Sequence, residues 1–167
     1  MTSTITGERA DLLETLAKHR FLLSNTARDL TDEQAAARTT VSELCVGGLI
    51  KHVALTEDGW ARFILDGPQP QDGAAFDDYA NGFRMLPGET LAGLLADYEK
   101  VAARTDELVR TLPDLDASQP LPEAPWFEKG ARWSARRVFL HIVAETAQHA
   151  GHADILRESI DGQKTMG

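Results

Sequence analysis

The chain has 167 residues, of which 26 are acidic and 17 are basic, giving a formal net charge of −9. This length suits one domain with a hydrophobic core, so we expect a single domain over residues 1–167. No cluster of Lys and Arg interrupts the acidic character, and we therefore expect neither nucleic acid nor an anionic membrane surface as a partner.

The N-terminus and the cysteine content indicate the compartment. The opening residues lack a basic region followed by an apolar run, and no stretch approaches the roughly 20 apolar residues that cross a bilayer. We therefore expect a cytoplasmic protein. The single cysteine, Cys45, cannot form an internal disulfide or build a cysteine-rich zinc site alone. Any metal ion would thus be held by His and carboxylate side chains.

The first segment with helical spacing follows the N-terminus. Leucines such as Leu12 and Leu16 recur there at steps of three and four residues, which predicts a helix over 7–29. Thr31 and Gln34 then have the spacing of a capping box, so we expect a short helical turn after the first helix.

The second long segment predicts a helix over 43–65. Ser42 stands before it and is a suitable N-cap. Gly67 and Pro68 end the apolar period, because glycine favours the conformation that closes a helix and proline cannot continue one.

The second half of the chain alternates two long loops with two helices. A crossover loop over 67–89 leads to a predicted helix over 90–111. A loop over 113–133 with four prolines leads to Ser134, the predicted N-cap of a helix over 135–159. No run alternates for long enough to predict a strand. Four helices of similar length predict an all-α four-helix bundle with long connecting loops.

The last predicted helix carries polar residues on its apolar side. At 100° per residue, Glu145, His149 and His152 share a stripe with Val138 and other apolar residues. His141 lies at the edge of that stripe, where a half-buried position is expected.

The second predicted helix also places an imidazole on its apolar side. His52 lies on one line with Leu49 and Thr56, whereas the charged Glu57 and Asp58 are directed elsewhere. His52 is thus expected to face the core from the middle of its helix.

Together, His52, Glu145 and His149 predict a metal site. A buried carboxylate and buried imidazoles need partners, and one divalent ion would satisfy all three residues while leaving a coordination position open. The alternative is structural: hydrogen-bonded core histidines and a Glu paired with a neighbouring Arg or His. A di-iron site is disfavoured, since it needs two Glu-x-x-His motifs and Glu145 is followed three residues later by Gln148.

Two further features of the sequence each have two interpretations. Cys45 lies two turns before His52 and either approaches the cavity or fills the core as a small apolar residue. Trp126, Phe127 and Trp133 lie close together in the second long loop, where they form either a pocket wall or a seal over the bundle end.

Three segments resemble a known family. They are "TTVSELCVGGLIKHVALTEDGW", "GETLAGLLADYEKVAARTDELV" and "WSARRVFLHIVAETAQHAGHADILRESIDG", which together span most of the chain from residue 39 onward. Their order and spacing resemble the DinB superfamily of metal-binding four-helix bundles, in its actinobacterial branch of mycothiol-dependent transferase-like proteins.

This resemblance implies a ligand set and a reaction. It assigns His52, Glu145 and His149 as ligands of one divalent ion, with zinc expected and nickel or iron able to accept the same donors. It also implies mycothiol, a small thiol, as co-substrate that attacks an electrophilic small molecule. His152 is expected to orient a ligand or to relay the thiol proton. Since the chain ends soon after "ESIDG", we expect a transferase rather than an isomerase with a further C-terminal domain.

Two other functions and a homodimer complete the expectations. A metal-bound water would make the protein a hydrolase, and a site without chemistry would make it a metal-binding or ligand-binding module. Phe21 and Leu22 widen the apolar surface of the first helix beyond a narrow stripe, and we expect a homodimer on that basis.

Overall fold

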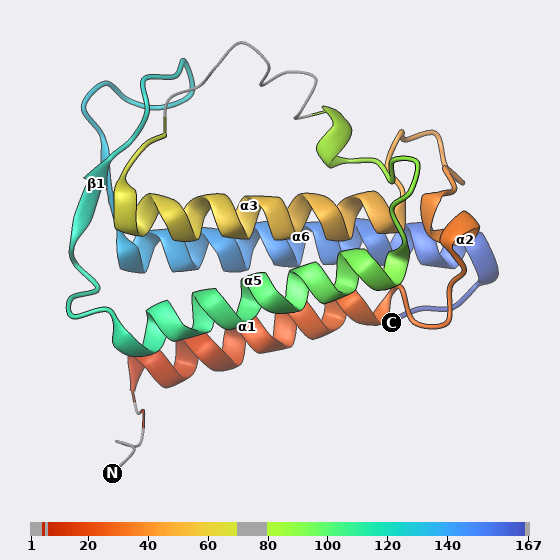
Figure 1. Cartoon of the computed structure of the whole chain (residues 1–167), viewed down its shortest axis with the longest axis horizontal. Helices are drawn as coiled ribbons and strands as arrows, with labels where there is room; N and C mark the ends of the chain where they lie inside the picture. Colours follow the sequence, from red (N-terminus) through yellow and green to blue (C-terminus); the bar gives the residue numbers. More distant parts are fainter. Residues whose placement is uncertain (1–4, 6, 70–79, 166–167) are drawn as a thin grey trace.

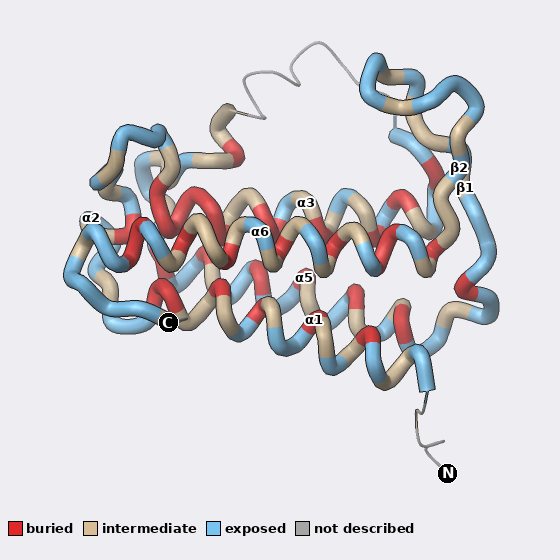
Figure 2. The backbone as a smooth tube through the Cα atoms, turned by 180° about the vertical axis from the view of Figure 1, so that it is seen from behind, coloured by how far each residue is buried: buried red, intermediate tan, exposed pale blue. Residues whose placement is uncertain are grey.

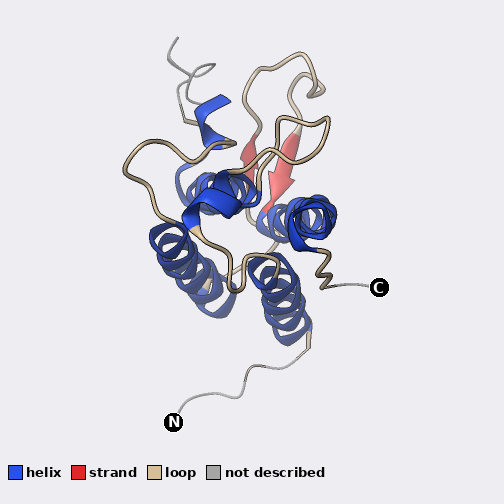
Figure 3. Cartoon of the chain, turned by 90° about the vertical axis from the view of Figure 1, so that its right-hand side faces the viewer, coloured by secondary structure: helices blue, strands red, loops and turns tan. Residues whose placement is uncertain are grey.

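Four long helices form two layers in the computed structural model, which describes residue 5 and residues 7–69 and 80–165. The elements in chain order are α1 (Glu8–Asn25), α2 (Asp32–Ala36), α3 (Val46–Asp66), α5 (Leu91–Thr111), β1 (Ser118–Pro120), β2 (Arg132–Ser134) and α6 (Ala135–Asp161). Helices α3 and α6 lie above α5 and α1 (Figure 1). Seen end-on, the four make a square (Figure 3), which confirms the predicted all-α four-helix bundle.

The direction of each helix follows from its connections. Helices α1 and α6 run one way along the bundle and α3 and α5 run the other way (Figure 1). The link from α3 to α5 crosses the length of the bundle, and ten residues of the predicted loop 67–89, 70–79, lie outside the described part of the chain. Residues 80–82 of that link are helical. Among the described residues, no helix is long and apolar enough to span a membrane.

Most of the predicted helix boundaries are confirmed, and one cap is wrong. Ser134 accepts from the Arg137 amide at the start of α6, and Thr31 forms the predicted capping box with Gln34. The N-cap of α3 is Cys45 and not Ser42. The Ser42 hydroxyl instead accepts a hydrogen bond from the Leu44 amide, because serine two residues before an amide readily forms such a local turn.

Two other ends differ from the sequence prediction. Helix α1 ends at Asn25, four residues early, and Asp29 that follows has a positive φ of 63°. The two short strands were not predicted at all. They pair antiparallel with Ser118 opposite Ser134, and at three residues each they are too short for an alternating pattern to appear. Their pairing fixes the chain where α6 begins.

The core consists of two apolar clusters with a polar layer between them. Red buried segments follow the inward faces of all four helices (Figure 2). One cluster, with Leu49 and Ile50, lies at the α2 end of the bundle. The other, with Phe139 and Ile142, lies at the end where β1 and β2 pair, called the hairpin end below. The core polar layer between them is made of Arg20, Glu57 and Asp106.

The core polar layer corrects the sequence reading of Glu57. This residue was expected to point away from the core, but it is 1% exposed and accepts two hydrogen bonds from Arg20. Helix α3 packs against α5 on one side and α6 on the other, so it is buried over a wider arc than a single stripe. Burial opposes the charge on Arg20, but hydrogen bonds and charges from Glu57 and Asp106 outweigh it and raise its pKa.

Candidate metal centre

Helices α3 and α6 bring the three predicted ligands together. His52 comes from the middle of α3, and Glu145 and His149 come from one face of α6. Each residue offers a ligand atom, and these atoms all lie within 4.8 Å of one another. The four-residue spacing on α6 explains the pairing of Glu145 with His149, since residues i and i+4 lie one above the other on a helix.

The Glu145 carboxylate lies between two imidazoles of its own helix. Its Oε1 is 3.6 Å from Nε2 of His141, and its Oε2 is 3.6 Å from Nε2 of His149. The other ring nitrogen of His149, Nδ1, lies 3.4 Å from Nδ1 of His152. His141 and His152 thus lie on either side of the pair that is predicted to ligate the metal.

Helix α3 contributes the His52 ring, which has contacts on two sides. His52 Nε2 lies 3.5 Å from the Thr56 hydroxyl, and its ring packs edge-on against His149 with the ring centres 4.8 Å apart. The Phe83 ring stacks on His52 at 3.8 Å, with 19° between the planes. Phe83 can approach this closely because a Cβ on Gly48 would overlap the Phe83 carbonyl.

Burial keeps these imidazoles neutral at neutral pH. Desolvation, helped by the nearby His149, lowers the pKa of His52 to about 4. Desolvation also lowers the pKa values of His149 and His141, although the Glu145 charge opposes it in both cases. A neutral imidazole has a lone pair available, which is the form that binds a metal ion.

The donor set fits a divalent ion. Two imidazoles and one carboxylate are ligands that zinc, nickel and iron accept, and three protein ligands are typical of a catalytic site with an open position. Ligands at about 2.1 Å from one tetrahedral ion are about 3.4 Å apart. The donor atoms therefore need only small side-chain rotations to meet one ion. That these residues ligate a metal is still a prediction.

Aromatic side chains surround His141 on the side of the hairpin end of the bundle. The rings of Trp60 and Trp133 stack with centres 4.9 Å apart, and His141 packs edge-on against both. The guanidinium carbon of Arg137 lies 4.1 Å from the centre of a Trp133 ring. Trp133 packs on the apolar cluster at that end, which fits the expected seal over the bundle end.

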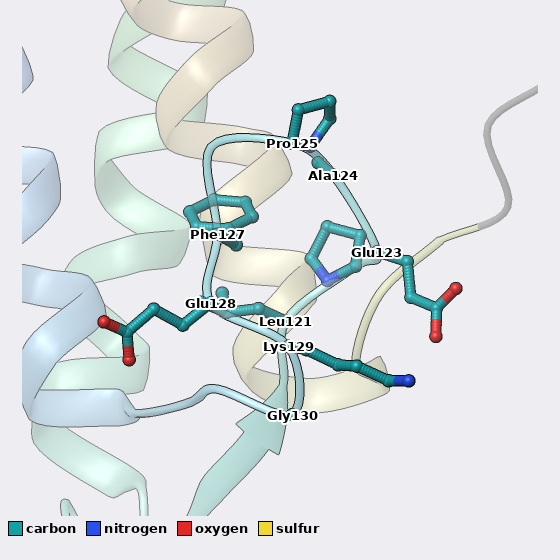
Figure 4. A pocket seen from close by; sticks show the side chains of 9 residues that line it. Leu121, Glu123, Ala124, Pro125, Phe127, Glu128, Lys129 and Gly130 are labelled. Atoms are coloured by element: carbon teal, nitrogen blue, oxygen red, sulfur yellow. The ribbon is translucent and has the colours of Figure 1, made fainter.

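The loop between the strands encloses a separate hollow. Residues 121–125 and 127–130 line a pocket of about 400 Å³, and Figure 4 shows Phe127 on its wall. Its lining includes none of the three predicted ligands. Phe127 connects the two regions, since its ring centre is 5.7 Å from that of Trp133, whereas Trp126 is 73% exposed and seals nothing.

Cys45 lies apart from the ligand cluster. It is the N-cap residue of α3, 3% exposed, with its sulfur 3.9 Å from the Phe83 carbonyl oxygen. The interpretation of Cys45 as a small core residue therefore fits its surroundings.

Sequence reasoning missed three residues of the site. Phe83, Trp60 and His141 all contact the ligands or their neighbours, yet none was assigned a role. For Phe83 a signal existed, because the pair Gly47 and Gly48 inside a helix indicates close approach of another segment. For His141 the signal was its spacing of four residues before Glu145.

Comparisons with known proteins support the fold and show the family. A crystal structure of a conserved protein from Enterococcus faecalis has a TM-score of 0.68 with 15% sequence identity, covering 95% of this chain and 100% of the other, and it supports the fold alone. No curated protein matches the sequence. The mycothiol-S-transferase family, of DinB-like fold, matches residues 11–162. The chain belongs to the mycothiol-S-transferase family.

Proposed function

We propose that the protein is a metal-dependent transferase that joins mycothiol to an electrophilic small molecule. The observation that carries the proposal is the His52, Glu145 and His149 cluster, which lies within the residues that match the family. A divalent ion held there, with zinc expected, would stabilise the thiolate form of a bound thiol.

The residues of the chain divide the remaining work. His52 and His149 offer neutral nitrogens, and Glu145 offers the charge that helps to retain a cation. His152 contacts His149 and is placed to orient that ring or to take the proton that the thiol loses. The thiol sulfur would form a bond to the electrophilic carbon as the bond from that carbon to its leaving group breaks, and the proton lost by the thiol would pass to the leaving group or to solvent.

Metal analysis of purified variants tests the ligand set. We expect one divalent ion per chain in the wild type and a sharp loss of occupancy in His52→Ala and His149→Ala. His19→Ala is the matched control, because His19 is a partly buried histidine of α1 outside the cluster. Full occupancy in the two ligand variants, or anomalous scattering from an ion elsewhere, would contradict the assignment.

Calorimetry tests the reaction class. Mycothiol that binds as a thiolate must release a proton, so the heat of binding should depend on the ionisation enthalpy of the buffer. The His52→Ala protein should show no such release. If mycothiol does not bind metal-loaded protein at millimolar concentration while esters or amides are hydrolysed in a metal-dependent way, the protein is a hydrolase. If the protein shows neither activity, it is a metal-binding or ligand-binding module.

The homodimer stays part of the proposal. Phe21 on α1 is 65% exposed, whereas Leu22 is partly buried against the core, so only Phe21 extends the apolar surface as expected. Leu140 and Ile155 on the neighbouring α6 are also more than half exposed. Light scattering over a range of concentrations tests association, and a Phe21→Ser variant should weaken it.

A further inference from the structure

His141 is held in place by two tryptophans. Its ring centre lies 4.9 Å from that of Trp60 and 5.0 Å from that of Trp133, edge-on in both cases. The two indoles stack on each other, and Arg137 packs on Trp133. Because these contacts come from α3, from β2 and from α6 itself, the imidazole has little freedom to turn.

The polar edge of this fixed ring faces Glu145. Nε2 of His141 is 3.6 Å from Oε1, while Oε2 faces His149 at the same distance. The Glu145 side chain is 29% exposed, and within the described residues no Lys or Arg forms an ion pair with it. The two oxygens of one carboxylate are therefore divided between two imidazoles.

His141 does not belong to the set of ligands itself. The three donor atoms that lie within 4.8 Å of one another come from His52, Glu145 and His149. The Glu145 oxygen that pairs with His141 is Oε1, whereas the one that pairs with His149 is Oε2. Its position is that of an outer partner that orients a ligand, as is common around protein-bound metals.

We propose that His141 is a positioning residue: its Nε2–H, 3.6 Å from Oε1 of Glu145 in this structure, donates a hydrogen bond to that oxygen when the metal is bound, which leaves Oε2 alone to bind the ion. A carboxylate without such a partner can bind an ion through both oxygens. By keeping Glu145 to one oxygen, His141 preserves the coordination position that the thiol needs. This inference rests on the proposed metal site, and it adds His141 as the residue that keeps one coordination position of that site open.

Two substitutions separate the donated hydrogen bond from packing. His141→Phe keeps a flat ring between the tryptophans and removes the donor, whereas His141→Gln keeps an N–H donor at comparable reach. His19→Phe repeats the first change on α1, outside the site. The readouts are metal affinity, by competition with a chelator, and the visible spectrum of the cobalt-loaded protein.

The expected results differ between the variants. His141→Phe should lower metal affinity by about 10- to 100-fold, the usual effect of losing an outer partner. Its cobalt spectrum should weaken, because a second Glu145 oxygen raises the coordination number and tetrahedral cobalt absorbs most strongly. His141→Gln should restore most of both signals, and His19→Phe should match the wild type.

Three outcomes would overturn the proposal. Unchanged affinity and spectrum in His141→Phe would show that Glu145 needs no partner. Equal losses in His141→Phe and His141→Gln, with the helical circular dichroism intact, would assign the effect to packing. A cobalt spectrum that reports one nitrogen ligand fewer in His141→Phe would make His141 a ligand. Failure of the wild type to bind any metal is a separate result, which rejects the metal site itself.

Discussion

Helix α3 carries two polar sites that differ in how they are satisfied. On one side, both oxygens of Glu57 accept hydrogen bonds from Arg20, at 2.5 and 3.2 Å, and Arg20 also donates to Asp106 at 2.7 Å. On the side that faces α6, His52 lies near His149 and Glu145, and the ion-pair partners of the Glu145 oxygens among the described residues are two imidazoles, each at 3.6 Å.

The difference distinguishes a structural polar cluster from a ligand site. The core polar layer contains its own cation, so the charge on Glu57 is neutralised within the protein. At the candidate metal centre the carboxylate is surrounded by rings whose lowered pKa values keep them neutral, and no internal cation balances it among the described residues. A divalent ion would supply there what Arg20 supplies in the core.

The largest effect should follow from breaking the core polar layer. Glu57→Ala leaves Arg20 buried with Asp106 as its remaining carboxylate, and we expect the free energy of unfolding to fall by about 3 kcal/mol. Urea denaturation of metal-free protein measures this. Asp58→Ala is the control, since Asp58 pairs with Arg62 and Arg104, whose side chains are more than half exposed and stay hydrated without it, so the loss should be less than about 1 kcal/mol. Equal losses in the two variants would contradict the comparison.

At the candidate metal centre we expect a substitution to lower metal affinity and to leave the stability of the metal-free protein unchanged. Glu145→Gln keeps the shape but removes the charge, so metal affinity should fall by about 100-fold or more, beyond the loss of an outer partner. The metal-free variant should unfold at the same urea concentration as the wild type, because Glu145 has no internal cation to lose. A clear loss of stability in the metal-free variant would make this site structural as well.

A smaller effect is expected from pH. The pKa of His52 is about 4 in the folded chain and about 6.5 when unfolded. Between these values only the unfolded chain binds the proton, so metal-free protein should lose stability as the pH falls from 6.5 toward 4. After allowance for solvent screening, the contribution between pH 7 and 5 is about 1 kcal/mol. His52→Gln should flatten this slope, and parallel slopes in urea titrations would refute it.

The smallest effect is expected from Cys45. Cys45→Ala removes one buried sulfur atom, which lies 3.9 Å from the Phe83 carbonyl oxygen, so stability should fall by about 1 kcal/mol or less. Metal affinity and the rate of thiol conjugation should be unchanged, because the proposed nucleophile is the small thiol. A variant without conjugation activity, measured by loss of free mycothiol, would show that the protein supplies a sulfur of its own.

The helices and the ligand cluster were predictable because both depend on local spacing. Apolar residues three and four apart define one face of a helix, and the same counting placed His52 and Glu145 on inward faces. The convergence of the three donors follows once α3 and α6 are neighbours in the bundle.

Other features were not predictable because they depend on partners that are distant in sequence. Glu57 is buried where α3 packs between α5 and α6, and its partner Arg20 is 37 residues away in the sequence. The hairpin strands are three residues long, which leaves no pattern to detect. Gly47 and Gly48 indicate that another segment approaches α3, but that Phe83 is the residue stacked on His52 depends on the path of a distant loop.

The contact between the ends of α1 and α6 joins the first and last long helices of the chain. Arg157 on α6 donates to the carbonyls of Thr26 and Arg28, just past α1. During synthesis α6 emerges after the other described helices, and it carries Glu145 and His149. Because two of the three predicted ligands lie on α6, the nascent chain cannot complete the metal site until α6 has been synthesised. Unlike a zinc finger, which folds around its metal, this bundle is expected to fold first and to be loaded afterwards.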